Sequence, residues 1–137
     1  MIEFLSETAF SLENEKAYII WIEQVIEYEG YSPGDISYIF CDDEYLHKIN
    51  LEFLNHDTLT DIITFDYTVG KQVHGEIYIS IERVKENAGS FSDSFESELK
   101  RVMIHGILHL LGYKDKTEEQ QTKMRSLENN CIAIFPK

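Results

Sequence analysis

The stretch that decides the fold runs from residue 102 to residue 115 and reads VMIHGILHLLGYKD. Its apolar residues predict a helix, and two histidines, His105 and His109, stand four residues apart on one face of that helix. Two polar rings on one stripe of an otherwise apolar helix require a reason, because an unpartnered buried polar group is costly. Gly112 falls where a left-handed residue would end the helix and turn the chain back toward the histidines.

The two histidines and Asp115 form the ligand pattern of a metal site. Both imidazoles can reach one ion, and Asp115 follows six residues after His109, at the offset from which a third ligand coordinates in zinc peptidases. Three protein ligands leave a fourth position open for water. We therefore predict one divalent ion per chain, Zn²⁺, held by His105, His109 and Asp115.

Each of these residues also has a plainer alternative role. The histidines can be satisfied by hydrogen bonds alone, and Asp115 can act as a negative charge near the start of the last helix, where the helix dipole favours it. His47, His56 and His74 can also supply a ligand, although nothing in their spacing selects one of them. The metal hypothesis is the stronger one because the apolar helix, the glycine turn and the carboxylate offset all agree with it.

Gly106 indicates which chemistry the metal would serve. Zinc peptidases carry the pattern H-E-x-x-H-x-x-G-x-x-H, in which the glutamate is the base, and Gly106 stands at the position of that glutamate. The exchange argues against a peptidase. A water activated by the metal, or by a base from elsewhere, suits phosphodiester or ester hydrolysis as well as amide hydrolysis. Because glycine inside a helix costs about 1 kcal/mol relative to alanine, we also expect Gly106 to let the helix approach a sheet closely.

Composition and charge indicate a single globular domain over residues 1–137. Apolar residues make up 43% of the chain, and Cys41 and Cys131 form no close pair, which fits a reducing compartment. No segment resembles a signal peptide or a membrane span, so we expect a cytoplasmic protein with no membrane partner. The net charge of −13 argues against nucleic acid, but the last 38 residues hold seven basic and four acidic side chains and permit an anionic substrate.

The hydrophobic pattern predicts an α+β or α/β fold, in which helices pack on a single β-sheet. We expect strands near residues 2–5, 36–41, 61–67 and 76–80. We expect helices near residues 13–29, after residue 42, near 82–87, from residue 93 through the histidines, and over 118–132. Residues 32–35 are typical of a turn, and Asp93 with Glu96 predicts a capping box at the start of the histidine helix.

The residues around the histidines resemble the signature H-G-x-L-H-L-x-G-Y-D-H of the YbeY family of bacterial endoribonucleases. Further positions are similar to that family and follow in its order: Asn50, Thr60–Phe65, Gly75–Ser80, and Met124 with Glu128. The resemblance implies an α+β fold with one mixed sheet, similar to the metal-binding core of zinc peptidases. It implies a zinc-dependent endoribonuclease specific for single-stranded RNA, with a role in 16S rRNA 3′-end maturation and ribosome quality control. Its implied partners are ribosomal RNA and the small ribosomal subunit, with no DNA.

Two departures from the family pattern bear on catalysis. Lys114 and Asp115 replace the family's final aspartate and histidine, which changes the type of the third ligand. Leu54 replaces an arginine suited to stabilising phosphate, a task that Lys100, Arg101 or Lys114 could take over. The lost arginine and the net charge favour an alternative function, a ribosome-assembly factor with a mainly structural zinc and little nuclease activity. The open coordination position favours the nuclease.

Asp61 is the remaining candidate for a catalytic role. Its carboxylate can orient a ligand histidine, or it can assist the metal-bound water of the His105, His109 and Asp115 site as a base. It can equally bind backbone amides where its own strand begins.

Overall fold

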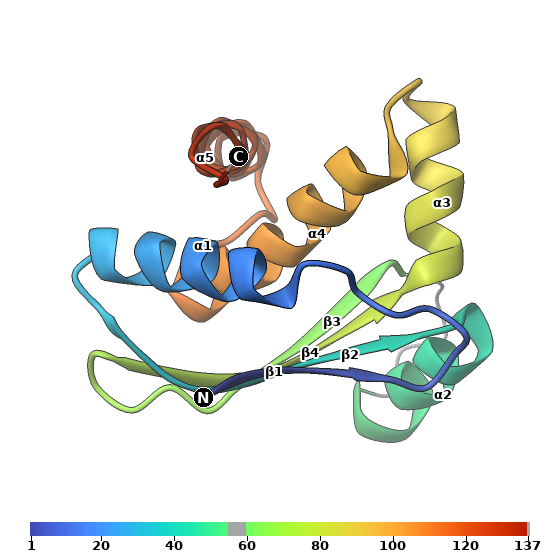
Figure 1. The fold of residues 1–137 in the computed structure, drawn as a ribbon, viewed down its shortest axis with the longest axis horizontal. Coiled ribbons are helices and arrows are strands. Elements are labelled where there is room, and N and C mark those ends of the chain that lie inside the picture. The colour runs from blue at the N-terminus through green and yellow to red at the C-terminus, as the bar shows by residue number, and fades with distance from the viewer. Residues whose placement is uncertain (55–59, 137) are drawn as a thin grey trace.

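The computed structural model describes residues 1–54 and 60–136 and arranges them around one β-sheet (Figure 1). The strands are β1 (Ile2–Ser6), β2 (Ser32–Cys41), β3 (Ile62–Asp66) and β4 (Gln72–Ser80). The helices are α1 (Glu15–Tyr28), α2 (Asp43–Leu54), α3 (Ile81–Ser90), α4 (Phe95–Leu110) and α5 (Glu118–Ala133). Within these described ranges, no helix has the length and apolar character needed to cross a membrane.

The sheet is mixed, which confirms the predicted α+β class. Its strand order is β1-β2-β4-β3, with β1, β2 and β4 parallel to one another and β3 antiparallel to β4. The chain passes from β3 to β4 through Gly70, whose φ of 59° lies in the left-handed region that glycine adopts without strain. β2 lies between two parallel neighbours and its last four residues are buried, as predicted for a central strand at residues 36–41.

Helices cover the two faces of the sheet unequally. α1 and α4 lie on one face with α5 outside them, whereas α2 lies against the other face (Figure 1). The larger core lies beneath α1 and α4, and its fully buried strand residues are Ile36, Tyr38, Phe40, Val73, Ile77 and Ile79. A smaller cluster under α2 consists of Cys41, Leu46 and Ile63. The histidine helix α4 is therefore packed on β3 and β4 and is itself contacted by α3 and α5.

Gly106 brings α4 close to the sheet, as its place in the helix predicts. A Cβ atom at this position would lie 3.0 Å from two side-chain carbons of Ile77 on β4 and 3.1 Å from one of Ile62 on β3. Ile77 is fully buried and cannot move without disturbing its neighbours, because protein cores are close-packed. The absence of a side chain at Gly106 therefore sets the distance between α4 and the sheet.

One local prediction was wrong at the start of β2. Residues 32–35 are not a separate turn, because β2 begins at Ser32, pairs with β4 at Ser32 and Pro33, and shifts register before Ile36. The physical reason is a side chain from β4: Nδ1 of His74 accepts the backbone N–H of Asp35 at 3.0 Å. This bond keeps the irregular residues attached to the sheet where the backbone ladder is interrupted.

Helix caps were predicted only in part. The predicted capping box of Asp93 and Glu96 is wrong by one position, because Ser94 is the N-cap of α4 and accepts a backbone N–H from the first turn. Asp93 instead accepts the N–H of Ser94 at 2.9 Å. Adjacent aspartate and serine residues both offer a capping oxygen, and the sequence pattern does not select between them. Thr117 and Gln120 form a capping box on α5 that was not predicted.

We predict that Gly106→Ala lowers the free energy of unfolding by about 1 kcal/mol. Overpacking a core costs about 1–3 kcal/mol, which exceeds the gain of about 1 kcal/mol in helix propensity. Gly89→Ala in α3 is the matched control, since a Cβ atom there meets nothing within 4 Å, and it should stabilise the protein by roughly 0.5–1 kcal/mol. Denaturant titration of the three proteins measures both changes. Equal stabilisation by both substitutions would contradict the close contact.

Candidate metal centre

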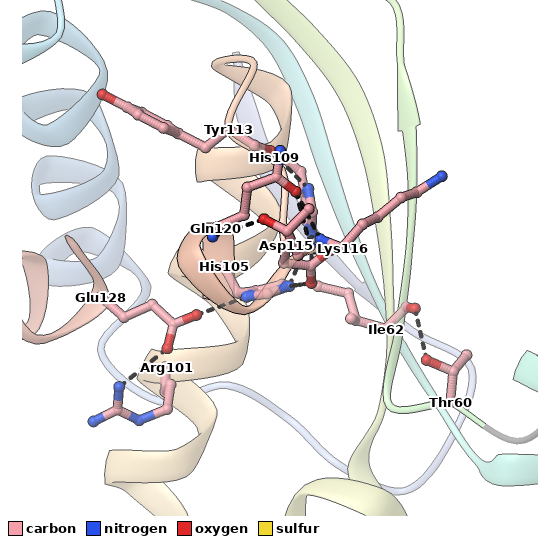
Figure 2. Close-up of polar contacts among 11 residues, drawn as sticks. Thr60, Ile62, Arg101, His105, His109, Tyr113, Asp115, Lys116, Gln120 and Glu128 are labelled. Atoms are coloured by element: carbon pink, nitrogen blue, oxygen red, sulfur yellow. Dashed lines mark hydrogen bonds and ion pairs between the residues drawn. The ribbon is translucent and has the colours of Figure 1, made fainter. Parts of the chain in front are cut away.

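Three donor atoms converge where α4 meets the loop that follows it (Figure 2). The Nε2 atoms of His105 and His109 lie 2.9 Å apart, and Oδ2 of Asp115 lies 3.2 Å from the first and 3.5 Å from the second. Among the described residues, these side chains form the one group of His, Cys, Asp and Glu donors close enough to share an ion. Donors in a tetrahedral zinc site with bonds of about 2.0–2.1 Å are about 3.3 Å apart. The predicted ligand set therefore has the spacing that a metal ion requires.

The turn at Gly112 brings Asp115 back to the histidines. Gly112 has a φ of 102°, and its N–H donates to the carbonyl of His109. The N–H of Tyr113 donates to the carbonyl of Leu108. These two bonds form a Schellman motif, which ends α4 and reverses the chain. The predicted role of Gly112 is confirmed.

The loop after Asp115 is tied to the start of α5. The N–H groups of Lys116 and Thr117 both donate to Oε1 of Gln120, at 3.0 and 3.1 Å (Figure 2). Asp115 lies ahead of the first turn of α5, whose acidic positions are the two glutamates that open the helix. Asp115 precedes Thr117, the N-cap of α5, by two residues, and its Oδ2 lies 3.2 Å and 3.5 Å from the two histidine Nε2 atoms.

Hydrogen bonds on the far side of each imidazole fix its orientation. Nδ1 of His109 lies 3.0 Å from the backbone oxygen of Tyr113, and because a carbonyl only accepts, Nδ1 carries the hydrogen and Nε2 presents a lone pair. Nδ1 of His105 lies 2.6 Å from Oε2 of Glu128 on α5. Histidines that bind metals commonly donate their other N–H to a carbonyl or carboxylate in this way. Both rings are therefore oriented toward a shared point (Figure 2).

Glu128 is the residue whose role sequence reasoning missed. It is 5% exposed, and its Oε1 accepts a hydrogen bond at 3.1 Å from Arg101, which lies one helical turn before His105. Two charged partners compensate the burial of this carboxylate. The orienting role that was considered for Asp61 therefore belongs to Glu128. The sequence did mark Glu128, because Glu128 and Met124 match positions of the family pattern. That match alone assigned no function to the residue.

Asp61 lies beside the donor atoms without a hydrogen bond to either histidine. It directly precedes β3, where its backbone oxygen accepts the N–H of Ser80 at 3.0 Å. Its side chain lines a pocket of about 420 Å³ together with His105 and Asp115. Burial raises the pKa of the Asp61 carboxyl group, although its own backbone N–H and the charge of His105 act in the opposite direction. A carboxyl group with a raised pKa in such a pocket is a candidate for proton transfer.

The three basic residues predicted to bind phosphate lie in different places. Lys100 is five residues before the first histidine, about 140° around the helix axis, and its ammonium group lies 3.9 Å from the ring centroid of Phe135. This corrects the prediction that placed Lys100 at the site. Arg101 lines the pocket but is held by Glu128. Lys114 is exposed in the loop beside the third donor.

The other histidines considered as ligands do not join the described donor group. His74 is bound to the backbone of Asp35 and, through Nε2, to the side chain of Gln72 at 3.0 Å. His47 lies on α2, across the sheet from α4, and His56 lies outside the described residues. Leu54, at the position of the family arginine, ends α2 and is 39% exposed.

Removing the charge of Glu128 should weaken metal binding. Glu128→Gln keeps the size of the side chain but holds the His105 N–H less strongly, so we expect zinc affinity to fall about 10- to 100-fold. Competition with a chromogenic chelator measures the affinity. Glu118→Gln, at the exposed start of α5, is the matched control and should bind zinc like the wild type. An unchanged affinity in Glu128→Gln would contradict the orienting role.

The metal-free chain should show a pH-dependent contribution from His105. Burial acts to lower the pKa of His105, but the hydrogen bond to Glu128 and the charges of Glu128, Asp115 and Asp61 outweigh it and raise the pKa above 6.5. A pKa that is higher in the folded state contributes stability below the unfolded value, and this stability is lost as pH rises through the folded value.

After chelator treatment, the excess stability of wild type over Glu128→Gln should therefore shrink as pH rises from about 6 to about 9. Free energies of unfolding from denaturant titrations at several pH values measure this difference. A difference that stays constant over that range would contradict the assignment.

Comparison with known proteins identifies relatives of this chain over nearly its whole length. The family model for Endoribonuclease YbeY matches residues 2–135. Endoribonuclease YbeY of Flavobacterium johnsoniae is 60% identical over 135 residues, which cover 98% of this chain and 97% of the relative. Endoribonuclease YbeY of Christiangramia forsetii is 61% identical over 134 residues, which cover 98% of this chain and 94% of the relative.

A solved structure is similar over the same length. The solution structure of TM1509 from Thermotoga maritima matches with a TM-score of 0.65 and 30% sequence identity, over 97% of this chain and 90% of that chain. The match of the family model over nearly the whole chain confirms the resemblance drawn from the histidine signature and the segments around it. This chain therefore belongs to the YbeY endoribonuclease family.

Proposed function

We propose that this chain is a zinc-dependent endoribonuclease that hydrolyses phosphodiester bonds in single-stranded RNA. The observation that carries the proposal is the group of three donor atoms, 2.9–3.5 Å apart, at a pocket of about 420 Å³. Structural zinc sites are closed by four protein ligands, whereas catalytic sites use three and leave one position open. Membership of an endoribonuclease family supports RNA as the substrate.

Zinc is the proposed metal because two imidazoles and one carboxylate are ligands that it commonly takes. A bound zinc ion lowers the pKa of a water molecule and stabilises negative charge on a phosphoryl oxygen. His105, His109 and Asp115 would hold the ion, while Glu128 and the backbone of Tyr113 keep the two rings in place.

Asp61 is the proposed proton acceptor for the attacking water. Its carboxyl group lines the same pocket as His105 and Asp115. The raised pKa of Asp61 moves it toward the range in which a carboxylate accepts a proton efficiently near neutral pH. Gly106, where a zinc peptidase has its glutamate base, supplies no such group.

Contacts to the RNA backbone are assigned to cations at the rim of the pocket. Arg125 is exposed and lines the pocket, and Lys114 is exposed beside Asp115. Arg101 chiefly supports Glu128, since its guanidinium group is already hydrogen-bonded there. These positions would replace the family arginine that is Leu54 in this chain.

The proposed biological substrate is the 3′ region of 16S rRNA, and the proposed partner is the small ribosomal subunit. The resemblance of the sequence to the family supports this role, together with one in ribosome quality control. A ribosomal RNA substrate fits an activity in the cytoplasm, and we expect no DNA partner. The single domain proposed for this activity spans residues 1–137.

Two observations favour a second function. The net charge of −13 and the leucine at position 54 both weaken the attraction of RNA phosphates, which dominates nucleic-acid affinity. They fit a ribosome-assembly factor that holds zinc mainly for structure and cleaves RNA weakly.

Cleavage of a single-stranded RNA by the zinc-loaded protein tests the proposal. His109→Ala removes one of three ligands and should reduce cleavage about 100-fold or more, and a chelator should have the same effect until zinc is restored. His74→Ala is the matched control, because it removes a histidine outside the donor group and should leave cleavage intact. Equal cleavage by wild type and His109→Ala would refute the nuclease. Binding to small subunits without cleavage would support the assembly factor.

A further inference from the structure

A buried carboxylate lies in the pocket beside the metal donors. Glu98, in the first turn of α4, is 6% exposed and lines the pocket that also reaches His105 and Asp115. Within the described part of the chain, its carboxylate makes no side-chain hydrogen bond and no ion pair within 4.0 Å, and its oxygens are not sealed from the pocket. A buried charge without such a partner is costly, so the pocket presents an acceptor that a ligand can satisfy.

The charges around Glu98 also indicate that its carboxyl group lacks a stabilising partner. Burial and the charge of Asp61 raise the pKa of the Glu98 carboxyl group, and the charges of Arg101 and Arg125 only partly oppose this effect. Among the described residues, Asp61 and Glu98 do not belong to any group of three close donors. With no third donor close to them in the part of the chain that the structure describes, the acceptor at this end of the pocket suits a hydrogen-bond donor on an organic ligand.

An exposed aromatic ring stands at the rim of the same pocket. Phe91, which follows the last residue of α3, is 68% exposed and lines the pocket. Exposed aromatic rings are the platforms on which single-stranded nucleic acids stack their bases. Asn87 from α3 and Gln121 from α5 add amide groups to the wall. A stacking ring, a buried acceptor and amide groups thus surround a space next to the metal donors.

We propose that this pocket is a nucleobase subsite for a nucleotide adjoining the bond that is cleaved, an inference that rests on the proposed nuclease function. The base stacks on Phe91, its amino group donates to Glu98, and Arg125 at the rim meets the neighbouring phosphate. Carboxylates read bases by accepting from exocyclic amino groups. The subsite therefore selects cytosine over uracil, which carries a carbonyl oxygen in place of the amino group.

Binding of CMP and UMP to the zinc-loaded protein, measured by calorimetry, tests the subsite independently of cleavage. CMP should bind about tenfold more tightly than UMP, as expected for one hydrogen bond to a charged acceptor. Glu98→Gln should reduce this preference to about twofold or less, because an amide offers both a donor and an acceptor. Glu96→Gln makes the same exchange at an exposed position of α4 and should retain the preference.

The stacking contact is tested with a second pair of variants. Phe91→Ala should weaken the binding of CMP and of UMP about tenfold each, without changing the ratio of the two affinities. Tyr28→Ala removes an exposed ring on α1 and should change neither affinity. Because Phe91 is exposed, this variant tests the subsite even if Glu98→Gln fails to fold.

The outcomes separate this inference from the nuclease proposal. Equal binding of CMP and UMP by the wild type, or a preference that survives Glu98→Gln, overturns the subsite even if RNA is cleaved. Unchanged binding by Phe91→Ala overturns the stacking contact. If the protein prefers CMP through Glu98 but does not cleave RNA, the subsite stands and the nuclease proposal fails.

Discussion

α4 packs against β3 and β4 at Gly106, where the helix backbone comes close to the side chains of Ile62 and Ile77. This contact fixes both the distance of α4 from the sheet and the rotation of α4 about its own axis. A rotation by one residue, about 100°, would carry His105 and His109 away from each of their present partners. The metal centre therefore depends on a steric contact made by a residue that has no side chain.

With α4 in this position, polar contacts from α5 and from the residue that follows α1 hold the donors in place. Glu128 on α5 joins His105 to Arg101, and the buried carboxylate has little freedom because both of its oxygens are bonded. Tyr113 is fixed at both ends: its backbone oxygen accepts from His109, and its hydroxyl donates to Glu29 after the end of α1 at 2.5 Å. That bond to Glu29 is the largest cause that raises the pKa of Tyr113 to about 12. Sites supported in this way keep the geometry that catalysis needs.

The charge of the pocket bears on how an acidic protein can act on RNA. Four carboxylates line the pocket, from Asp61, Glu98, Asp115 and Glu128, against the two guanidinium groups of Arg101 and Arg125. Without a metal, this surface repels phosphate. A dication at the donor group would offset the excess negative charge where the substrate is bound.

The sequence by itself determined features that depend on neighbours along the chain. The period of the helix places His105 and His109 on one face, Gly112 ends that helix in a left-handed turn, and Gly106 marks the close approach to the sheet. The apolar run of β2 identified the central strand, and the spaced family segments identified the mixed fold. Apart from the mixed fold, which the family resemblance implied, these features follow from local backbone geometry, which a short stretch of residues specifies without reference to the rest.

Only the tertiary structure decided which distant residues meet. Glu128 reaches His105 across 23 residues of sequence, and Lys100, adjacent to Arg101, points to another surface. His74 turned a predicted turn into the start of β2, and the pocket brings Phe91 and Asp61 together from separate elements. Such pairs depend on how the helices pack on the sheet. The energy of this packing arises from contacts between distant segments, so a local sequence pattern does not specify which residues meet.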